Sequence, residues 1–214
     1  MQCYLSDRFD HLIIKLFLLL CLSVCVFSSY RGVQFSIALK LTQKDCSNGS
    51  TKSLNVVDFK AIRGVMAKGE IYRKGPITAA IPLRRFNKDG KPHTEHSERR
   101  VLSSTTTDGV ECLIFYTYNS PCTKHCLGTD LELNISDVVK EKFQHVNEGY
   151  KAFVFSTIYY KDLDKTKEEI YTLMKQIEGP KLYCCYETTN GVECFGFNMN
   201  VGPDQHCLSQ MESK

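Results

Sequence analysis

His96, Glu98, Cys122 and Cys126 are the residues of this 214-residue sequence whose types and spacing suggest chemistry. An imidazole and two thiolates suit zinc, and three protein ligands leave a fourth position open for water. Zinc lowers the pKa of such a water to about 7, which generates hydroxide at neutral pH. A carboxylate two residues from the histidine can reach that water and transfer its proton without binding the metal. The set predicts a hydrolytic zinc centre in which Glu98 is the catalytic residue.

The spacing of the cysteines leaves the ligand set open. The elements His96-Ser-Glu98 and Pro121-Cys122-Thr-Lys-His-Cys126 resemble the pattern H-x-E…P-C-x-x-C, but three residues separate the cysteines instead of two. Literal two-residue spacing pairs Cys122 with His125. Two cysteines one turn apart at the start of a helix can both reach one metal, and a helix N-terminus favours thiolates. A disulfide between Cys122 and Cys126, with His96 in an exposed loop, is the remaining alternative.

The elements that must position these residues alternate along the chain. Apolar and aromatic residues predict strands at 33–41, 111–118 and 151–160, and two more strands within 70–85, broken at Gly75-Pro76. Helical spacing predicts helices at 53–68, 96–103, 136–144 and 165–178. Ser136 is predicted as an N-cap, and 182–197 as a hairpin around Asn190-Gly191. Helices between strands let the strands lie parallel, so the order predicts an α/β fold.

Composition limits the class of protein. Apolar residues make up 43% and charged residues 24%, which is ordinary globular usage, and the length suits one domain with a sizeable core. The net charge of +3 comes from 27 basic and 24 acidic residues, so no strongly basic field indicates nucleic-acid binding. We therefore predict a single domain over residues 30–214, after a distinct N-terminal segment.

That N-terminal segment, residues 1–29, has the features of a signal peptide. Arg8 and Lys15 precede an uncharged apolar run from Leu16 to Phe27, and Ser28 and Ser29 follow it. The run of 12 residues is shorter than the roughly 20 that a membrane span needs. We expect secretion through the endoplasmic reticulum and no transmembrane segment in the mature chain. An uncleaved signal anchor is the alternative.

The eleven cysteines fit an oxidising compartment. Three lie in the predicted signal peptide, which leaves an even number in the mature chain. Without Cys122 and Cys126, six remain as disulfide candidates, and the sequence does not choose among their pairings: Cys46, Cys112, Cys184, Cys185, Cys194 and Cys207. Cys184 and Cys185 should point to opposite faces of a strand and so have different partners. Asn48 and Asn134 begin sequons and are candidates for N-glycosylation.

Three segments carry a resemblance to a known family. Tyr118-Asn-Ser-Pro-Cys122, His96-Ser-Glu98 and Ser156-Thr-Ile-Tyr-Tyr-Lys-Asp162 together resemble the AID/APOBEC deaminases. The signal peptide and extra cysteines make the chain most similar to the secreted novel AID/APOBEC-like deaminases, over roughly residues 53–200. The resemblance implies a cytidine-deaminase-like fold, with a five-stranded mixed sheet flanked by helices on both faces. Because that branch tolerates two to four residues between its cysteines, it favours His96, Cys122 and Cys126 as zinc ligands.

The resemblance also implies an activity. It predicts a secreted zinc-dependent enzyme that hydrolyses cytosine to uracil in single-stranded nucleic acid, foreign or extracellular, in immune defence. Glu98 would be the proton shuttle, and Tyr159, Tyr160 and Asp162 would contact the preceding base. Asn119, a further candidate substrate contact, stands where the family usually has Trp. The alternatives are a deaminase of free cytidine or its nucleotides, usually oligomeric, and a catalytically silent secreted zinc-binding module, against which the intact Glu98 argues.

Overall fold

The computed structural model describes residues 34–50, 52–54, 57–86, 89–129, 133–188, 191–197 and 207–208. The predicted signal peptide lies outside these residues. Among the helices of the described ranges, none has the length and apolar character needed to cross a bilayer.

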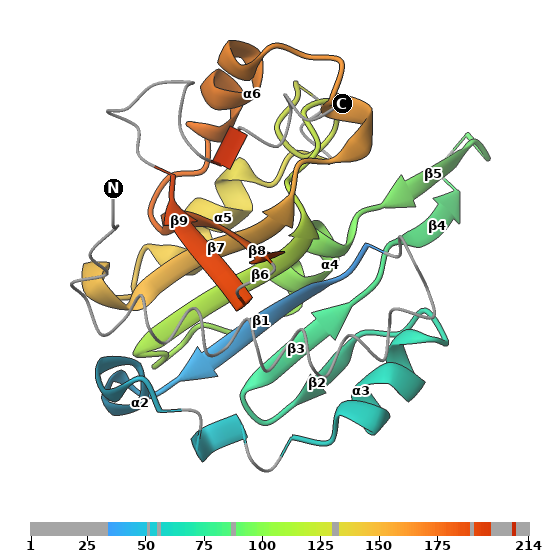
Figure 1. Ribbon diagram of the computed structural model, residues 1–214. Helices are drawn as coiled ribbons and strands as arrows, with labels where there is room; N and C mark the ends of the chain where they lie inside the picture. The colour runs from blue at the N-terminus through green and yellow to red at the C-terminus, as the bar shows by residue number, and fades with distance from the viewer. Residues whose placement is uncertain are drawn as a thin grey trace.

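A seven-stranded mixed sheet forms the centre of the protein, in the order β2-β3-β1-β6-β7-β8-β9 (Figure 1). Its strands are β1 (Ser36–Leu41), β2 (Tyr72–Lys74), β3 (Ile77–Ala80), β6 (Cys112–Asn119), β7 (Lys151–Thr157), β8 (Lys181–Thr188) and β9 (Gly191–Gly196). β6, β7 and β8 are parallel neighbours, and all other neighbours in this sheet are antiparallel. The predicted mixed α/β architecture is confirmed.

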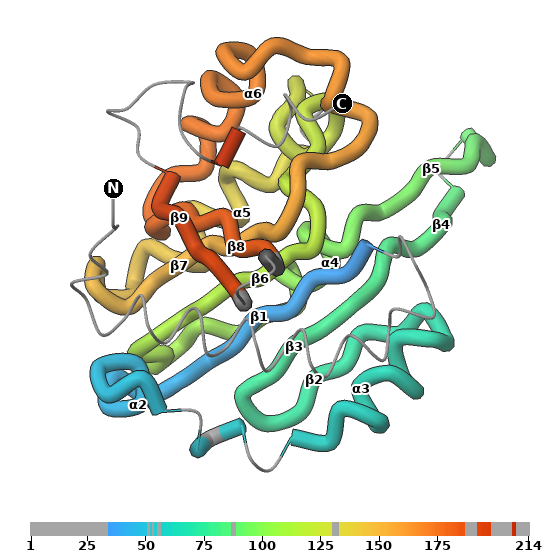
Figure 2. Tube along the Cα trace, in the orientation of Figure 1, coloured from blue at the N-terminus to red at the C-terminus, as the bar shows by residue number. Residues whose placement is uncertain are grey.

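The expected number of five strands was wrong. Five inner strands, β3-β1-β6-β7-β8, are extended at the two edges by β2 and β9 (Figure 2). Each edge strand pairs antiparallel with the inner strand that is next to it in the sequence. Gly75 has a φ of 57° between β2 and β3, and Thr188 of β8 pairs with Gly191 of β9. Each of these two hairpins therefore adds one strand to an edge of the sheet, which gives seven strands in place of five.

A separate two-stranded sheet lies beside this core. β4 (Leu83–Phe86) pairs antiparallel with β5 (Pro92–Glu95), and the pair projects from the body of the protein (Figure 1). β5 leads directly into His96. The sequence-based prediction placed no strand at β5 and no hairpin here.

Five α-helices and three single turns of 3₁₀ helix complete the described secondary structure. They are α2 (Gln43–Asn48), α3 (Phe59–Met66), α4 (Ser97–Ser104), α5 (Ser136–Phe143), α6 (Lys167–Met174), η2 (Lys52–Leu54), η3 (Glu148–Tyr150) and η4 (Tyr160–Asp162). Side chains of Thr42, Asp58 and Thr166 cap α2, α3 and α6, the last in a capping box with Glu169. The predicted helix over 53–68 is instead η2 followed by α3, and α2 was not predicted.

The prediction of Ser136 as an N-cap was wrong. Ile135 holds the N-cap position of α5, and the Ser136 hydroxyl is buried without a hydrogen-bond partner among the described residues. The Asn134 side chain takes the capping role, because its Oδ1 accepts the Ser136 N–H at 2.7 Å. Asn134 is thus a structural residue of this helix start as well as a sequon residue.

Helices cover both faces of the sheet. Successive strand residues point to opposite faces, so Leu113 and Phe115 of β6 join one core and Ile114 and Tyr116 join the other. The first core receives buried residues of α4, α5 and α6, and the second receives buried residues of α2 and α3. The expected placement of helices on both faces agrees with this arrangement.

The six cysteines left over from the predicted metal site form three disulfides. The pairs are Cys46–Cys112, Cys184–Cys207 and Cys185–Cys194. The first ties α2 to the start of β6, and the third joins directly opposite residues of β8 and β9. The neighbours Cys184 and Cys185 have different partners and belong to opposite cores.

Candidate metal centre

One end of the sheet gathers the residues of the predicted site. β6 and β7 are parallel, so their C-terminal ends coincide, with Asn119 paired to Thr157. β1 is antiparallel to β6, so its first residues lie at the same end, and Ser36 pairs with Thr117. Strand pairing therefore brings together residues from distant parts of the sequence.

His96 and Glu98 stand at the start of α4. His96 is the N-cap residue, with an extended backbone (φ −70°, ψ 149°) and no side-chain capping bond, and Glu98 lies in the first turn. The imidazole is thus free of a capping role.

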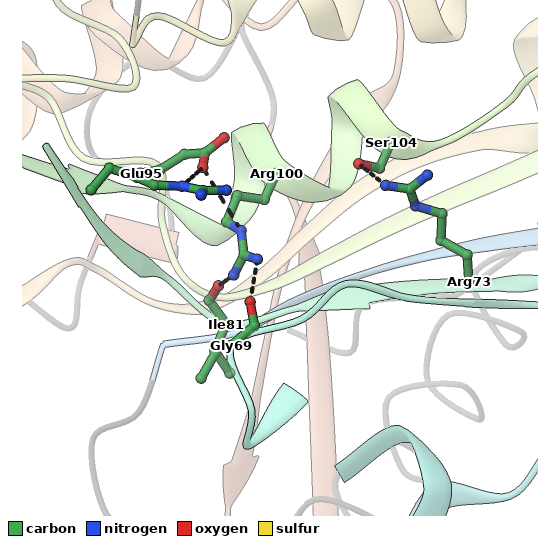
Figure 3. Close-up of polar contacts among 7 residues, drawn as sticks. Gly69, Arg73, Ile81, Glu95, Arg100 and Ser104 are labelled. Carbon is green, nitrogen blue, oxygen red and sulfur yellow. Dashed lines mark hydrogen bonds and ion pairs between the residues drawn. The ribbon is translucent and has the colours of Figure 1, made fainter. Parts of the chain in front are cut away.

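Arginine contacts fix α4 on two sides. The Arg100 side chain is buried, with 3% exposure for the residue, and its guanidinium donates to the Ile81 carbonyl and to the Gly69 carbonyl at 2.6 Å (Figure 3). Its Nε lies 4.0 Å from a Glu95 carboxylate oxygen. The neighbouring Arg99 donates to the Asn134 carbonyl at 2.7 Å. Both arginines bind main-chain carbonyls, so they hold the helix that carries His96 in place.

The two cysteines of the site lie on a turn, and the expected helix start is absent from the described residues 122–129. The Leu127 N–H donates to the Cys122 carbonyl at 3.1 Å, and the Cys126 N–H donates to the Cys122 sulfur at 3.4 Å. Gly128 allows this turn to close, because a Cβ there would lie 2.0 Å from the Lys124 carbonyl oxygen. The turn brings both sulfurs to one point, as the helix was expected to do.

The three predicted ligands form one compact group. His96 Nδ1 lies 3.5 Å from the Cys122 sulfur and 3.2 Å from the Cys126 sulfur, and the sulfurs are 3.6 Å apart without a disulfide. Tetrahedral zinc with ordinary bond lengths places its ligand atoms about 3.4–3.8 Å apart. The donor types fit zinc, two of the three separations fall in this range, and the His96–Cys126 separation of 3.2 Å is slightly shorter.

His125 lies beside this group. Its ring centroid is 5.8 Å from that of His96, in an edge-on orientation, and it is half-buried. In the part of the chain that the structure describes, the group that could hold a metal comprises His96, Cys122 and Cys126 without His125.

The electrostatics of the site favour a cation. The hydrogen bond that the Cys126 thiol donates lowers the pKa of Cys122 to about 4. The same hydrogen bond, together with burial, raises the pKa of Cys126. Burial lowers the pKa of His96, but the hydrogen bond and negative charge of Cys122 outweigh it and raise the pKa overall. The arrangement thus favours the thiolate form of Cys122, which is the form that binds a metal.

Glu98 is buried next to the ligand group without belonging to it. Its exposed fraction is 1%, and desolvation raises the pKa of its carboxyl. Oε1 accepts a hydrogen bond from Gln34 Nε2 at 2.9 Å, and Oε2 accepts one from the Ser97 hydroxyl at 3.1 Å. Sequence reasoning missed Gln34, since no motif marks it and only the packing of α4 against β1 brings it to Glu98.

The predicted substrate contacts occupy different environments. Tyr160 is 64% exposed, and Tyr159 is half-buried with its ring centroid 4.9 Å from that of Tyr160. Burial raises the pKa of Tyr159 to about 12, so it stays a neutral phenol. Asn119 is half-buried, and its N–H donates to Gln34 Oε1 at 2.9 Å.

Asp162 faces inward, toward the cysteine turn. It is only 4% exposed, and its carboxylate accepts the Thr123 N–H at 2.9 Å and the Thr123 hydroxyl at 2.5 Å. Burial raises the pKa of Asp162, and the two Thr123 hydrogen bonds oppose that rise. The carboxylate thus contacts the residue that follows Cys122.

A mixed α/β sheet whose strand ends carry a His-x-Glu element beside a cysteine pair is consistent with the zinc deaminases of nucleobases as a class. The family model of the Secreted Novel AID/APOBEC-like Deaminase 1 matches residues 24–211, and the chain belongs to this family. Comparison with curated proteins and with solved structures gives no match.

Proposed function

We propose that the chain is a secreted zinc-dependent enzyme that hydrolyses cytosine to uracil in single-stranded nucleic acid. The observation that carries the proposal is the buried carboxylate of Glu98, held beside the group of His96, Cys122 and Cys126 but outside it. A zinc site that only stabilises a fold has no use for such a carboxylate, which argues against a silent zinc-binding module. Family membership supports a deaminase of the cytidine type.

The mechanism assigns one task to each group. His96 Nδ1 and the sulfurs of Cys122 and Cys126 would hold zinc, which when bound supplies an acidified water as nucleophile. The Glu98 carboxylate takes a proton from the attacking water and delivers it to the departing amino group, so Glu98 ends in its starting state. Cytosine and water give uracil and ammonia.

Exposed aromatic side chains near the site support a strand as substrate. Tyr118, 39% exposed near the end of β6, is stacked on Phe35 of the opposite core, with ring centroids 6.1 Å apart, so the exposed ring on the side of the cysteines is Tyr160. Tyr160 follows β7, and Lys161 Nζ lies 5.7 Å from its ring centroid. Exposed rings with a nearby cation are what proteins use to stack bases and contact phosphates of single strands. A free nucleoside is bound in an enclosed pocket and needs no such rings.

Secretion belongs to the same proposal. The word "Secreted" in the family description and the three disulfides support an oxidising, extracellular environment. We propose cleavage after the signal peptide at 1–29, one domain over 30–214, and action on foreign nucleic acid in immune defence.

The test is uracil formation by the zinc-loaded mature protein. Cytosine-containing single-stranded DNA, single-stranded RNA and free cytidine are each offered, and we expect uracil from at least one strand. Glu98→Gln should lose about 10²–10⁴-fold in rate while binding one zinc per chain. Glu168→Gln, on the exposed side of α6, is the matched control and should keep full activity. Absence of uracil from all three substrates would contradict the proposal, and uracil from cytidine alone would establish the nucleoside deaminase instead.

A further inference from the structure

Gln34 connects two parts of the candidate site, and we propose that it is the positioning residue for Glu98. The inference rests on the proposed function, because it concerns the proton-transfer step assigned to Glu98. Gln34 precedes β1, whereas Glu98 lies in α4, and 64 positions separate them in the sequence. Their contact at 2.9 Å is made where α4 packs against β1.

Four side chains and the Glu98 carboxylate form a closed ring of polar contacts. Gln34 Nε2 contacts Glu98 Oε1 at 2.9 Å and the Thr117 hydroxyl at 2.8 Å. The Ser36 hydroxyl lies 3.1 Å from that of Thr117 and 2.8 Å from that of Ser97. The Ser97 hydroxyl returns to Glu98 Oε2 at 3.1 Å. Both carboxylate oxygens are therefore held, from two different directions.

The orientation of the Gln34 amide follows from its third contact. A backbone N–H can only donate, so the atom that faces the Asn119 N–H at 2.9 Å must be the amide oxygen. The amide nitrogen must then face Glu98 and Thr117, where its two protons are used. The Ser36 hydroxyl donates to Thr117, which also accepts from Gln34, and the Ser97 hydroxyl donates to Glu98, so each oxygen of the Glu98 carboxylate has its own donor.

The ring lies in the interior, where an unmet hydrogen bond is costly. Ser36, Ser97 and Thr117 have 0% exposure, and Glu98 has 1%. Without Gln34, Glu98 Oε1 would lose its donor from a separate element, and the Ser97 hydroxyl and the Glu98 N–H, both from the start of α4 itself, would remain. A glutamate side chain has three rotatable bonds, and proton transfer requires that its oxygen be placed within hydrogen-bond reach of the reacting atoms.

Gln34 also joins Glu98 to the metal ligands. Its oxygen binds the last residue of β6, Asn119, and the chain continues from there through Ser120 and Pro121 to Cys122. One amide thus sets the position of the proton-transfer group relative to the strand that delivers a metal ligand. We therefore expect Gln34 to affect the rate of the chemical step and not the affinity for the metal.

The decisive variant is Gln34→Leu, which keeps the approximate size of the side chain and removes both the nitrogen and the oxygen of its amide. We expect kcat to fall about 10–100-fold, the usual loss when a supporting hydrogen-bond partner is removed, with KM and zinc content close to wild type. The melting temperature should fall by only a few degrees, because the partners of Gln34 lose hydrogen bonds in the interior while the protein stays folded at the assay temperature. Gln34→Asn keeps the amide on a shorter side chain, should lose less in kcat, and serves if Gln34→Leu fails to fold. Gln176→Leu, at an exposed position after α6, is the matched control and should behave as wild type.

Two results would overturn the inference. One is a kcat of Gln34→Leu within twofold of wild type. The other is a loss of zinc or melting temperature that accounts for the loss of kcat, since this would show a general structural role. If wild type itself forms no uracil, the proposed function fails, and the inference is tested by crystal structures of both zinc-loaded proteins. A shift of the Glu98 carboxylate by more than about 0.5 Å in the variant supports it, and an unmoved carboxylate contradicts it.

Discussion

Two regions of the protein use buried cysteine in opposite ways. At the metal centre, Cys122 and Cys126 are unbonded with their sulfurs 3.6 Å apart, whereas Cys46, Cys184 and Cys207 are equally buried and oxidised to disulfides. Burial and apolar surroundings do not separate the groups, because Cys122, Cys126, Cys184 and Cys207 belong to one core. The difference is the imidazole of His96, whose Nδ1 lies 3.2–3.5 Å from both free sulfurs. A neighbouring imidazole therefore distinguishes the two candidate metal ligands from the cysteines that form disulfides.

The largest expected effect is at the metal centre and decides which third ligand is used. Cys126→Ser should lose stoichiometric zinc, a drop in affinity greater than the 10–100-fold typical of residues that only support ligands. His125→Ala should keep one zinc per chain, since His125 stands outside the ligand group. Zinc content measured by atomic spectroscopy checks both. The reverse result would make His125 the ligand and Cys126 a structural cysteine.

The next effect is in the disulfide region and concerns stability alone. Replacing Cys46 and Cys112 with alanine removes a disulfide that links residues 66 positions apart. The loss should lower the free energy of unfolding by about 4 kcal/mol. The Cys185–Cys194 pair closes only 9 positions, so its double alanine variant should lose about 3 kcal/mol. Denaturant unfolding gives both values. Zinc content should not change in either variant, and a parallel loss of zinc would erase the distinction between the two regions.

A smaller effect separates a support of the cysteine turn from a substrate contact. Asp162→Asn weakens the contacts with Thr123 and should lower zinc affinity about 10–100-fold without changing flanking-base preference. Tyr160→Ala should leave zinc affinity intact and weaken strand binding by about 1–3 kcal/mol. Zinc titration and oligonucleotide binding are measured on both. A changed base preference in Asp162→Asn at full zinc occupancy would instead support the predicted role of Asp162 as a substrate contact.

The smallest effect concerns the two sequons. Asn48 is exposed at the end of α2, so we expect it to carry a glycan without loss of stability. Asn48→Gln should lower the mass by one glycan and leave the free energy of unfolding unchanged. Asn134 Nδ2 donates to the Gly128 carbonyl at 2.6 Å while Oδ1 caps α5. Asn134→Gln should therefore cost about 1 kcal/mol without losing a glycan. Mass spectrometry of secreted protein decides, and a glycan on Asn134 would contradict this division.

Regular patterns made most of the fold predictable. β6, β7, α4, α5 and the β8–β9 hairpin lie within two or three residues of their predicted bounds, because each buries an apolar set with a clear period. α2 buries one residue, Cys46, and its place depends on a disulfide to β6, so local pattern could not show it. β4 and β5 are mostly exposed and have no buried face to produce a period.

The site was predictable only where a motif exists. His96, Cys122 and Cys126 come together as their spacing indicated, with the turn at 123–126 in place of a helix. Gln34 and the inward orientation of Asp162 depend on strand pairing and on a contact across 39 positions, which no local pattern encodes. The long-range hydrogen bonds are thus the part of the site that could not be predicted from the sequence.

The closed ring around Glu98 has a consequence for the order of folding. The metal ligands span only positions 96 to 126, whereas the ring and its link to Asn119 join positions 61 to 85 apart. Contacts between distant positions form late, because more chain entropy must be lost to make them. We expect a newly made chain to gather its zinc ligands first, which shields Cys122 and Cys126 from oxidation during secretion. Glu98 would become competent only afterwards, when β1 docks against β6 and delivers Gln34.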